Sequence, residues 1–200
     1  EMCIRDSYYS YHLSQKNTTI LVLNSGLWAP RYDNSEMAPE IAENHMDWFE
    51  LQLQQAKQQN HKLIIMSHIP PGHVKNTDDW FPTYFNKYVS LCAEYKNIIL
   101  GQFYGHHSKE YIRAFNSDVA LLAGSGITPL GGGSLTRHGK DPNNPTFKYL
   151  LFSENTLMDA VTFYRDLSVG TEISLFQNDV IHSKEDFQGN NIDTVPSDIK

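Results

Sequence analysis

The sequence predicts an α/β fold built on a parallel sheet. Three apolar runs, at 18–25, 62–67 and 97–105, have the length and continuous hydrophobicity of buried strands. Helical patterns at 43–60 and 84–95 lie between these runs. Strands that are apolar throughout are typical of parallel strands covered on both faces, so the order strand–helix–strand–helix–strand indicates this class.

The composition is that of a globular protein. The chain has 200 residues, of which 40% are hydrophobic and 20% charged, and this suffices for a sizeable core. Its net charge of -7 argues against a nucleic-acid duplex as partner, because such binding depends on basic side chains. The sequence contains neither an apolar run of the roughly 20 residues that a transmembrane segment needs nor a signal-peptide core.

The first strand, "TTILVLNS", is apolar from Ile20 to Leu23 and is broken by Asn24 and Ser25. The second, "KLIIMS", leads into "HIPPGH". The third, "NIILGQFYG", leads into two histidines and a serine. Each buried strand therefore ends in polar residues.

The first helix has one apolar face, formed by Met46, Phe49, Leu53 and Ala56. Asn44 and Asp47 resemble a capping box, which predicts that this helix begins near residue 43. His45 and His61 flank the helix and are expected to be solvated.

The second helix has a stripe of core residues, formed by Tyr84, Tyr88, Leu91 and Tyr95. Cys92 lies beside the stripe and is expected to be a small buried apolar residue.

The chain divides into three predicted segments. Residues 1–17 begin with "EMCIRDS", which matches nothing downstream, so we expect a non-native or disordered leader. Residues 18–168 form the main domain, with short strands in its second half. Residues 169–200 begin a helical C-terminal segment, with the helix itself at 171–187.

Histidines follow two of the three buried strands. His68 follows "LIIMS", and His106 and His107 follow "IILGQFYG". The carboxyl ends of parallel strands lie at one edge of a sheet, so these side chains can reach the same crevice. Imidazole nitrogens on rigid loops suit a zinc site, although the spacing alone leaves hydrogen-bonding loop residues as an alternative.

The motifs "SHIPPGH" and "QFYGHHS" resemble the calcineurin-like metallophosphoesterases, and within them the acid sphingomyelinase-like phosphodiesterases. "MDWFELQLQQA", "GSGITP" and "NNPTFKYLLF" are similar to segments of the same branch. The resemblance extends over residues 18–190. It implies a partial four-layer α-β-β-α sandwich of mixed sheets, in which two zinc ions activate the water that hydrolyses a phosphodiester.

Two histidines can be matched to ligands of that family. His68 matches the family's histidine after a later strand, and His106 matches the first histidine of its Gly-His-x-His motif. By resemblance, both bind the same ion. Ser108 replaces the last histidine of that motif and leaves the other site incomplete, because a neutral hydroxyl is a poor zinc ligand. His107 is a substitute ligand only if the loop shifts by one residue.

The family's upstream motifs Asp-x-His, Gly-Asp and Gly-Asn-His have no match in this chain. We therefore expect the C-terminal half of a catalytic domain that is inactive alone, and no catalytic residue is assigned. The leading hypothesis is a fragment of a metal-dependent phosphodiesterase that acts on a lipid or nucleotide phosphodiester. His73 either contacts that substrate or caps the proline loop.

Two alternatives remain. A degenerate, non-catalytic family member that serves as a binding module would explain Ser108. A small-molecule-binding α/β domain would need no metal at the histidines. The family, together with the sequon Asn17-Thr18-Thr19, implies a glycoprotein located outside the cytosol, either extracellular or lysosomal.

Overall fold

The computed structural model describes residues 7–30, 39–72, 80–107, 110–115, 119–124, 145–153, 156–164 and 177–182. The chain forms two compact units, Glu1–Tyr104 and Gly105–Lys200, and each is described by itself.

The strands of the first unit form a mixed sheet in the order β1-β2-β3-β4. β1 (Tyr9–Leu13) is antiparallel to β2 (Thr18–Val22). β2, β3 (Lys62–Met66) and β4 (Ile99–Tyr104) are parallel neighbours. The three strands expected from the sequence are confirmed as parallel neighbours, and with them the α/β class. Their burial is not continuous, because Met66 of β3 is exposed.

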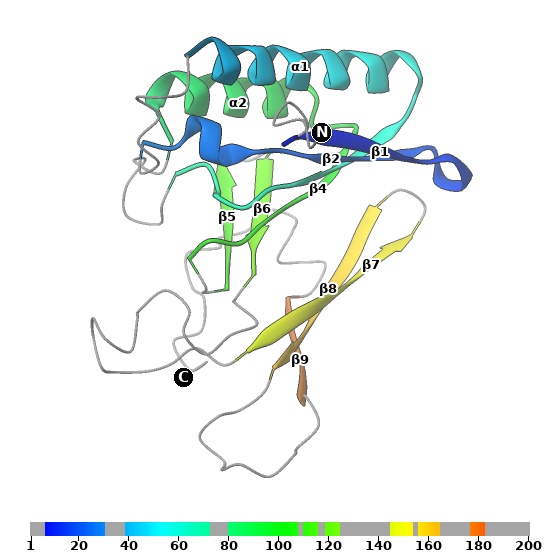
Figure 1. The fold of residues 1–200 in the computed structure, drawn as a ribbon. Helices are drawn as coiled ribbons and strands as arrows, with labels where there is room; N and C mark the ends of the chain where they lie inside the picture. The colour runs from blue at the N-terminus through cyan, green and yellow to red at the C-terminus, as the bar shows by residue number, and fades with distance from the viewer. Residues whose placement is uncertain are drawn as a thin grey trace, which may run out of the picture. The chain divides into compact units, whose positions relative to one another are not determined.

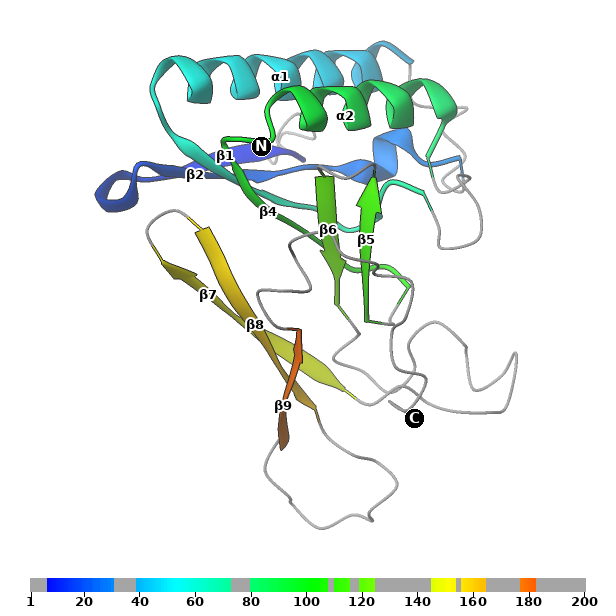
Figure 2. The same cartoon turned by 180° about the vertical axis from the view of Figure 1, so that it is seen from behind.

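Both helices of the first unit lie on one face of the sheet (Figures 1 and 2). α1 (Pro39–Gln58) connects β2 to β3, and α2 (Pro82–Glu94) connects β3 to β4. Because β2, β3 and β4 follow one another in space as in sequence, right-handed crossovers place both helices on the same side. The expected helix start near residue 43 is wrong, since α1 begins at Pro39 and the supposed capping box lies inside it.

The core lies between the helices and the sheet. Paired residues of parallel strands point to the same face, so Leu21, Ile65 and Gln102 form a row across β2, β3 and β4. The predicted apolar face of α1 is buried, as are Tyr88 and Cys92 of α2. The Tyr88 hydroxyl donates to Gln102 Oε1 at 2.5 Å, so the one amide in this row is paired.

His45 contradicts the expectation that it is solvated, because its ring is fully buried. It is stacked between Tyr8, with centroids 3.9 Å apart, and Trp28, at 4.3 Å. Among the described residues, neither ring nitrogen has a hydrogen-bond partner. Burial without a partner penalises the charged imidazolium and lowers the pKa of His45 to about 3. His61 is half-buried and stacks on His12.

Part of the expected leader contributes to the first unit. Residues 1–6 lie outside the described residues, whereas β1 pairs along its whole length with β2. Tyr8 precedes β1 and covers one side of His45.

The described strands of the second unit form a hairpin and a three-stranded antiparallel sheet. β5 (Tyr111–Phe115) pairs with β6 (Val119–Ala123), and β7 (Thr146–Ser153), β8 (Thr156–Tyr164) and β9 (Gln177–His182) lie in that order. The helix expected at 171–187 is wrong over β9, which pairs with β8 instead. Tertiary pairing determines this outcome, because the backbone N–H and C=O groups of β9 find hydrogen-bond partners in β8.

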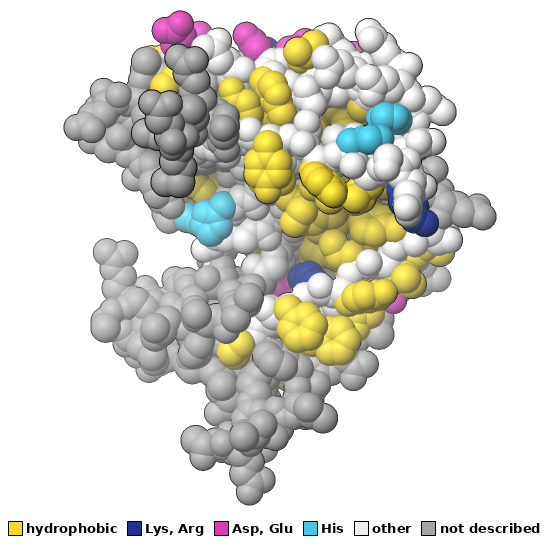
Figure 3. All heavy atoms as spheres, turned by 45° about the vertical axis from the view of Figure 1, so that its right-hand side comes forward, with side chains coloured by type: hydrophobic (Ala, Val, Ile, Leu, Met, Phe, Trp, Pro, Cys, Tyr) yellow, Lys and Arg dark blue, Asp and Glu magenta, His cyan; other side chains and the backbone are white. Residues whose placement is uncertain are grey.

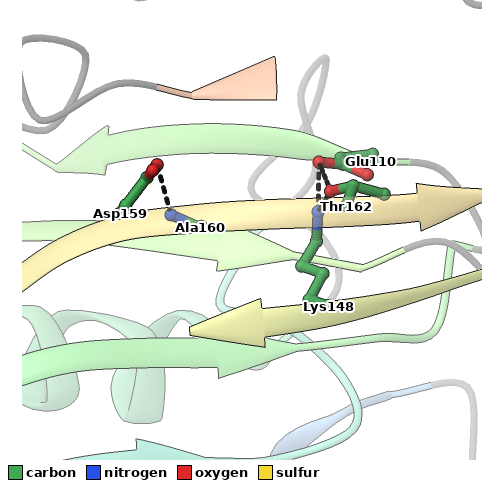
Figure 4. A network of polar contacts seen from close by, with 5 residues as sticks. All are labelled: Glu110, Lys148, Asp159, Ala160 and Thr162. Carbon is green, nitrogen blue, oxygen red and sulfur yellow. Dashed lines mark hydrogen bonds and ion pairs between the residues drawn. The ribbon is translucent and has the colours of Figure 1, made fainter. Parts of the chain in front are cut away.

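A buried ion pair stabilises the second unit (Figure 4). The side chains of Lys148 and Glu110 are 12% and 9% exposed, and the Lys148 ammonium donates to Glu110. The hydroxyl of Thr162 donates to the same carboxylate at 2.9 Å, and it also accepts from Lys148 Nζ at 2.5 Å. Burial lowers the pKa of Lys148, while the charge of Glu110 opposes that shift.

Apolar side chains are exposed on sheet faces of both units, and Figure 3 shows hydrophobic side chains at the surface in yellow. The exposed ones on strands are Tyr9, Tyr11, Met66, Phe147, Tyr149 and Leu151. Exposed apolar faces favour association, so we expect the isolated chain to aggregate readily.

The burial of His45 predicts that the protein becomes less stable as the pH falls. The unfolded imidazole binds a proton below its ordinary pKa of 6.5, but the folded one does so only near 3. Its stabilising contribution is therefore complete above pH 6.5 and is lost as the pH falls toward 3. We expect a loss of about 2 kcal/mol at pH 5, measured by urea unfolding.

The variant H45F is the matched control, because it keeps a stacked ring without a titratable nitrogen. It should retain more of its stability at acidic pH than the wild-type chain. Equal pH dependence of both proteins would show that the imidazole is not the responsible group.

The buried pair predicts a strong effect of removing one charge. K148M should lower the free energy of unfolding by about 3 kcal/mol, because the Glu110 carboxylate stays buried without its cation. E110Q in the K148M background should recover part of that loss. K87M is the control, since Lys87 pairs with Asp47 and Glu50 at the surface and should change stability by less than about 1 kcal/mol.

Candidate metal site

His68 lies at the carboxyl end of β3, two residues beyond the last residue of the strand, Met66. Ser67 N–H donates to the Phe103 carbonyl at 3.0 Å and so continues the ladder between β3 and β4 up to the histidine. The His68 side chain is exposed, whereas Ile69 and the following Pro70, Pro71 and Gly72 are buried. The loop backbone is thus packed into the protein while the imidazole faces outward.

Two serines connect the ends of β2 and β3. The hydroxyl of Ser67 donates to the Leu23 carbonyl at 2.8 Å, and the oxygens of the Ser67 and Ser25 hydroxyls are 2.7 Å apart. Ser25 Oγ also accepts the Ile69 N–H at 2.8 Å. The chain is therefore anchored on both sides of His68. From the sequence, Ser25 is predicted only to break the strand, although a serine follows each of these two adjacent strands.

His106 occupies a strained backbone conformation. Its φ is 72°, in the left-handed region that residues with a side chain rarely adopt. The His107 N–H donates to the Gly105 carbonyl at 2.9 Å, which closes a three-residue γ-turn around His106. A γ-turn with a positive central φ is uncommon and strained, and such strain often occurs at functional sites.

The turn continues directly from the buried end of β4. Tyr104 is the last residue of that strand, and its hydroxyl oxygen lies 2.6 Å from that of Tyr88. Tyr104 therefore belongs to the core of the first unit. The boundary between the two units falls immediately after it.

The predicted ligands fall in different parts of the structure. His68 belongs to the first unit, and His106 and His107 belong to the second. The rings of the two adjacent histidines have centroids 5.0 Å apart and an interplanar angle of 67°. His73 and Ser108 lie outside the described residues. Within the described ranges, no three His, Cys, Asp or Glu side chains come together as a metal-binding group.

The donor chemistry fits part of a zinc site. Imidazole nitrogen is a common zinc donor, and both histidine-bearing turns have fixed backbones. A centre of two ions also needs a bridging group and further ligands, which the described residues do not assemble. Each of these histidines by itself offers one imidazole donor to an ion.

The chain is similar to several phosphodiesterases. It is 29% identical to human acid sphingomyelinase-like phosphodiesterase 3b over 163 residues, which are 74% of this chain and 34% of that protein. It is 27% identical to sphingomyelinase phosphodiesterase D of Dictyostelium discoideum, over 76% of this chain and 35% of that protein. It is 24% identical to human cyclic GMP-AMP phosphodiesterase SMPDL3A, over 82% of this chain and 38% of that protein.

These similarities confirm the resemblance seen in the motifs. The chain is a relative of the acid sphingomyelinase-like phosphodiesterases. It spans about a third of the length of the curated relatives that it matches. No family model matches the sequence.

Similarity to solved structures is weaker. A dimetal phosphatase from Danio rerio matches with a TM-score of 0.49 and 11% identity, over 79% of this chain and 56% of that chain, which is too low to establish a shared fold. In the described part of the chain, none of the helices is long and apolar enough to cross a membrane.

The strained turn predicts an unusual order of stability among variants of His106. Glycine adopts a positive φ without penalty, whereas alanine keeps the Cβ that causes the strain. H106G should therefore be more stable than H106A by about 1 kcal/mol in urea unfolding, although glycine is normally the more destabilising residue. Both variants lack the imidazole, so the comparison isolates the backbone. A more stable alanine variant would contradict the strained turn.

Proposed function

We propose that the chain is part of a metal-dependent phosphodiesterase in which His68 and His106 bind one zinc ion. The observation that carries this proposal is the position of the histidines after β3 and β4, two adjacent parallel strands whose carboxyl ends lie at one edge of the sheet. His107 follows His106 on the same turn. It is the proposed substitute for the metal ligand that Ser108 replaces.

A bound divalent ion supplies an activated water and neutralises charge on the phosphate of the substrate. The contribution of this chain is to hold neutral imidazole nitrogens at fixed backbone positions. The remaining ligands of a two-ion centre would come from other parts of the parent protein. We therefore propose that these 200 residues alone do not turn over substrate.

The substrate that we propose is a phosphodiester of a lipid or a nucleotide. The names of the relatives include sphingomyelinase-like and cyclic GMP-AMP phosphodiesterases, which span both classes. His73, five residues after His68, is the proposed substrate contact. The relationship to these proteins and the sequon at Asn17 support an extracellular or lysosomal glycoprotein.

A second function has one observation in its favour. Ser108 occupies the position of a family metal ligand, and a hydroxyl at that position weakens zinc binding. A non-catalytic binding module would retain the fold while losing one ion. S108H tests this second function, because tighter zinc binding by S108H than by the wild-type chain would indicate that Ser108 has cost the parent protein a metal ligand and, with it, catalysis.

Zinc binding tests the proposed ligands. H68A and H106A should each weaken the binding of zinc to the full chain by at least tenfold in a calorimetric titration, because each removes one donor nitrogen. The control is H61A, since His61 directly precedes β3 and lies at the opposite end of that strand from His68. Equal losses in all three variants, or in none, would contradict a metal site at these strand ends.

A further inference from the structure

We infer that Ser25 is a positioning residue for His68, which fixes the backbone from which this imidazole reaches a metal ion. The inference rests on the proposed metal role of His68. All the residues concerned belong to the first unit. Ser25 acts on the proposed metal site through the backbone of His68, and its own side chain does not bind the ion.

Ser25 contacts the chain on both sides of His68. Its hydroxyl oxygen lies 2.7 Å from the hydroxyl of Ser67, the residue before the histidine. The same oxygen accepts the N–H of Ile69, the residue after it, at 2.8 Å. The Ser25 N–H adds a longer contact of 3.3 Å to Ser67 Oγ. One buried side chain thus determines where the backbone enters and leaves the histidine.

Further hydrogen bonds hold the residues that precede and follow His68. Ile69 is buried, and its carbonyl accepts from the indole of Trp80 at 3.2 Å, so its N–H and its carbonyl both have partners. Ser67 donates its N–H to Phe103 and its hydroxyl to the Leu23 carbonyl. His68 is therefore the exposed residue between two fixed ones.

Ser25 itself has little room to move. It is 1% exposed and begins the short 3-10 helix η3 (Ser25–Trp28), directly after the loop that leaves β2. Trp28 at the end of η3 donates its indole N–H to Ala42 of α1 at 3.1 Å. The position of His68 is consequently tied to β2 and α1 as well as to its own strand. A ligand held in this way loses little conformational entropy when it binds a metal ion.

A purely structural role would also explain buried hydroxyls, so the experiment needs a matched control. S25A removes the anchoring hydroxyl. T18V removes another buried hydroxyl at the other end of β2, where Thr18 Oγ1 donates to the Lys16 carbonyl at 3.0 Å. T18V loses one hydrogen bond, whereas S25A loses the contacts of Ser25 Oγ with Ser67 Oγ and with the Ile69 N–H, so S25A should show the larger loss in urea unfolding. They differ in whether the lost bond touches the His68 loop.

Zinc affinity and amide exchange of the full chain give the decisive readouts. S25A should weaken zinc binding by 10- to 100-fold, the range for partners that orient a metal ligand, whereas T18V should leave it unchanged. The Ile69 amide should exchange faster in S25A than in T18V. S25T, which keeps a hydroxyl, should recover part of the zinc affinity. Wild-type zinc affinity in S25A, despite faster exchange at Ile69, would overturn the inference.

A separate measurement distinguishes this failure from failure of the proposed function. If the wild-type chain and H68A bind zinc equally, His68 is not a ligand and the proposed metal site is wrong. The rotamer distribution of His68, from side-chain coupling constants in NMR, then decides about positioning. A single rotamer in wild type that becomes an average in S25A supports it, and the same distribution in both proteins refutes it.

Discussion

The parallel pairing of β2, β3 and β4 is the constraint on which the rest of the first unit depends. Parallel hydrogen bonding brings the carboxyl ends of these strands to one edge, and the crossover helices must then lie together on one face. The polar residues that follow each strand consequently become neighbours of the next strand's end. Ser25 and Ser67 are 42 residues apart in the sequence. Ser25 can contact the loop of His68 only because of this pairing.

The sequence predicts the elements of this arrangement better than its polar contacts. The strands could be found because each is a continuous apolar run, and the histidines that follow them could be found from their place. The expectation that His45 is solvated is wrong because it assumes a helix start at residue 43, which places the ring at a frayed end. With the true start at Pro39, His45 lies beside Ala42, Met46 and Phe49 on the buried face. The hydroxyl of Ser25 left no periodic signal, because its partner is distant in sequence.

The second unit shows the same limit for a different physical reason. Gln177–His182 has no apolar periodicity strong enough to decide between helix and strand, so its pairing with β8 determines the outcome. The ion pair of Glu110 and Lys148 is likewise a tertiary feature. Each charge would be costly if buried alone, and the low exposure of both residues exists only because they meet beside Thr162.

The backbone of His106 bears on the choice between an active and a degenerate parent protein. Glycine would relieve the positive φ at this position, so a histidine there carries a backbone cost. A loop without a role for its imidazole gains nothing from that cost. Ser108 argues for the loss of one metal ligand, but the strained turn argues that the remaining ligand still has a function. Under the proposed metal role of these histidines, the two observations together favour a parent protein that keeps one ion over one that has lost both.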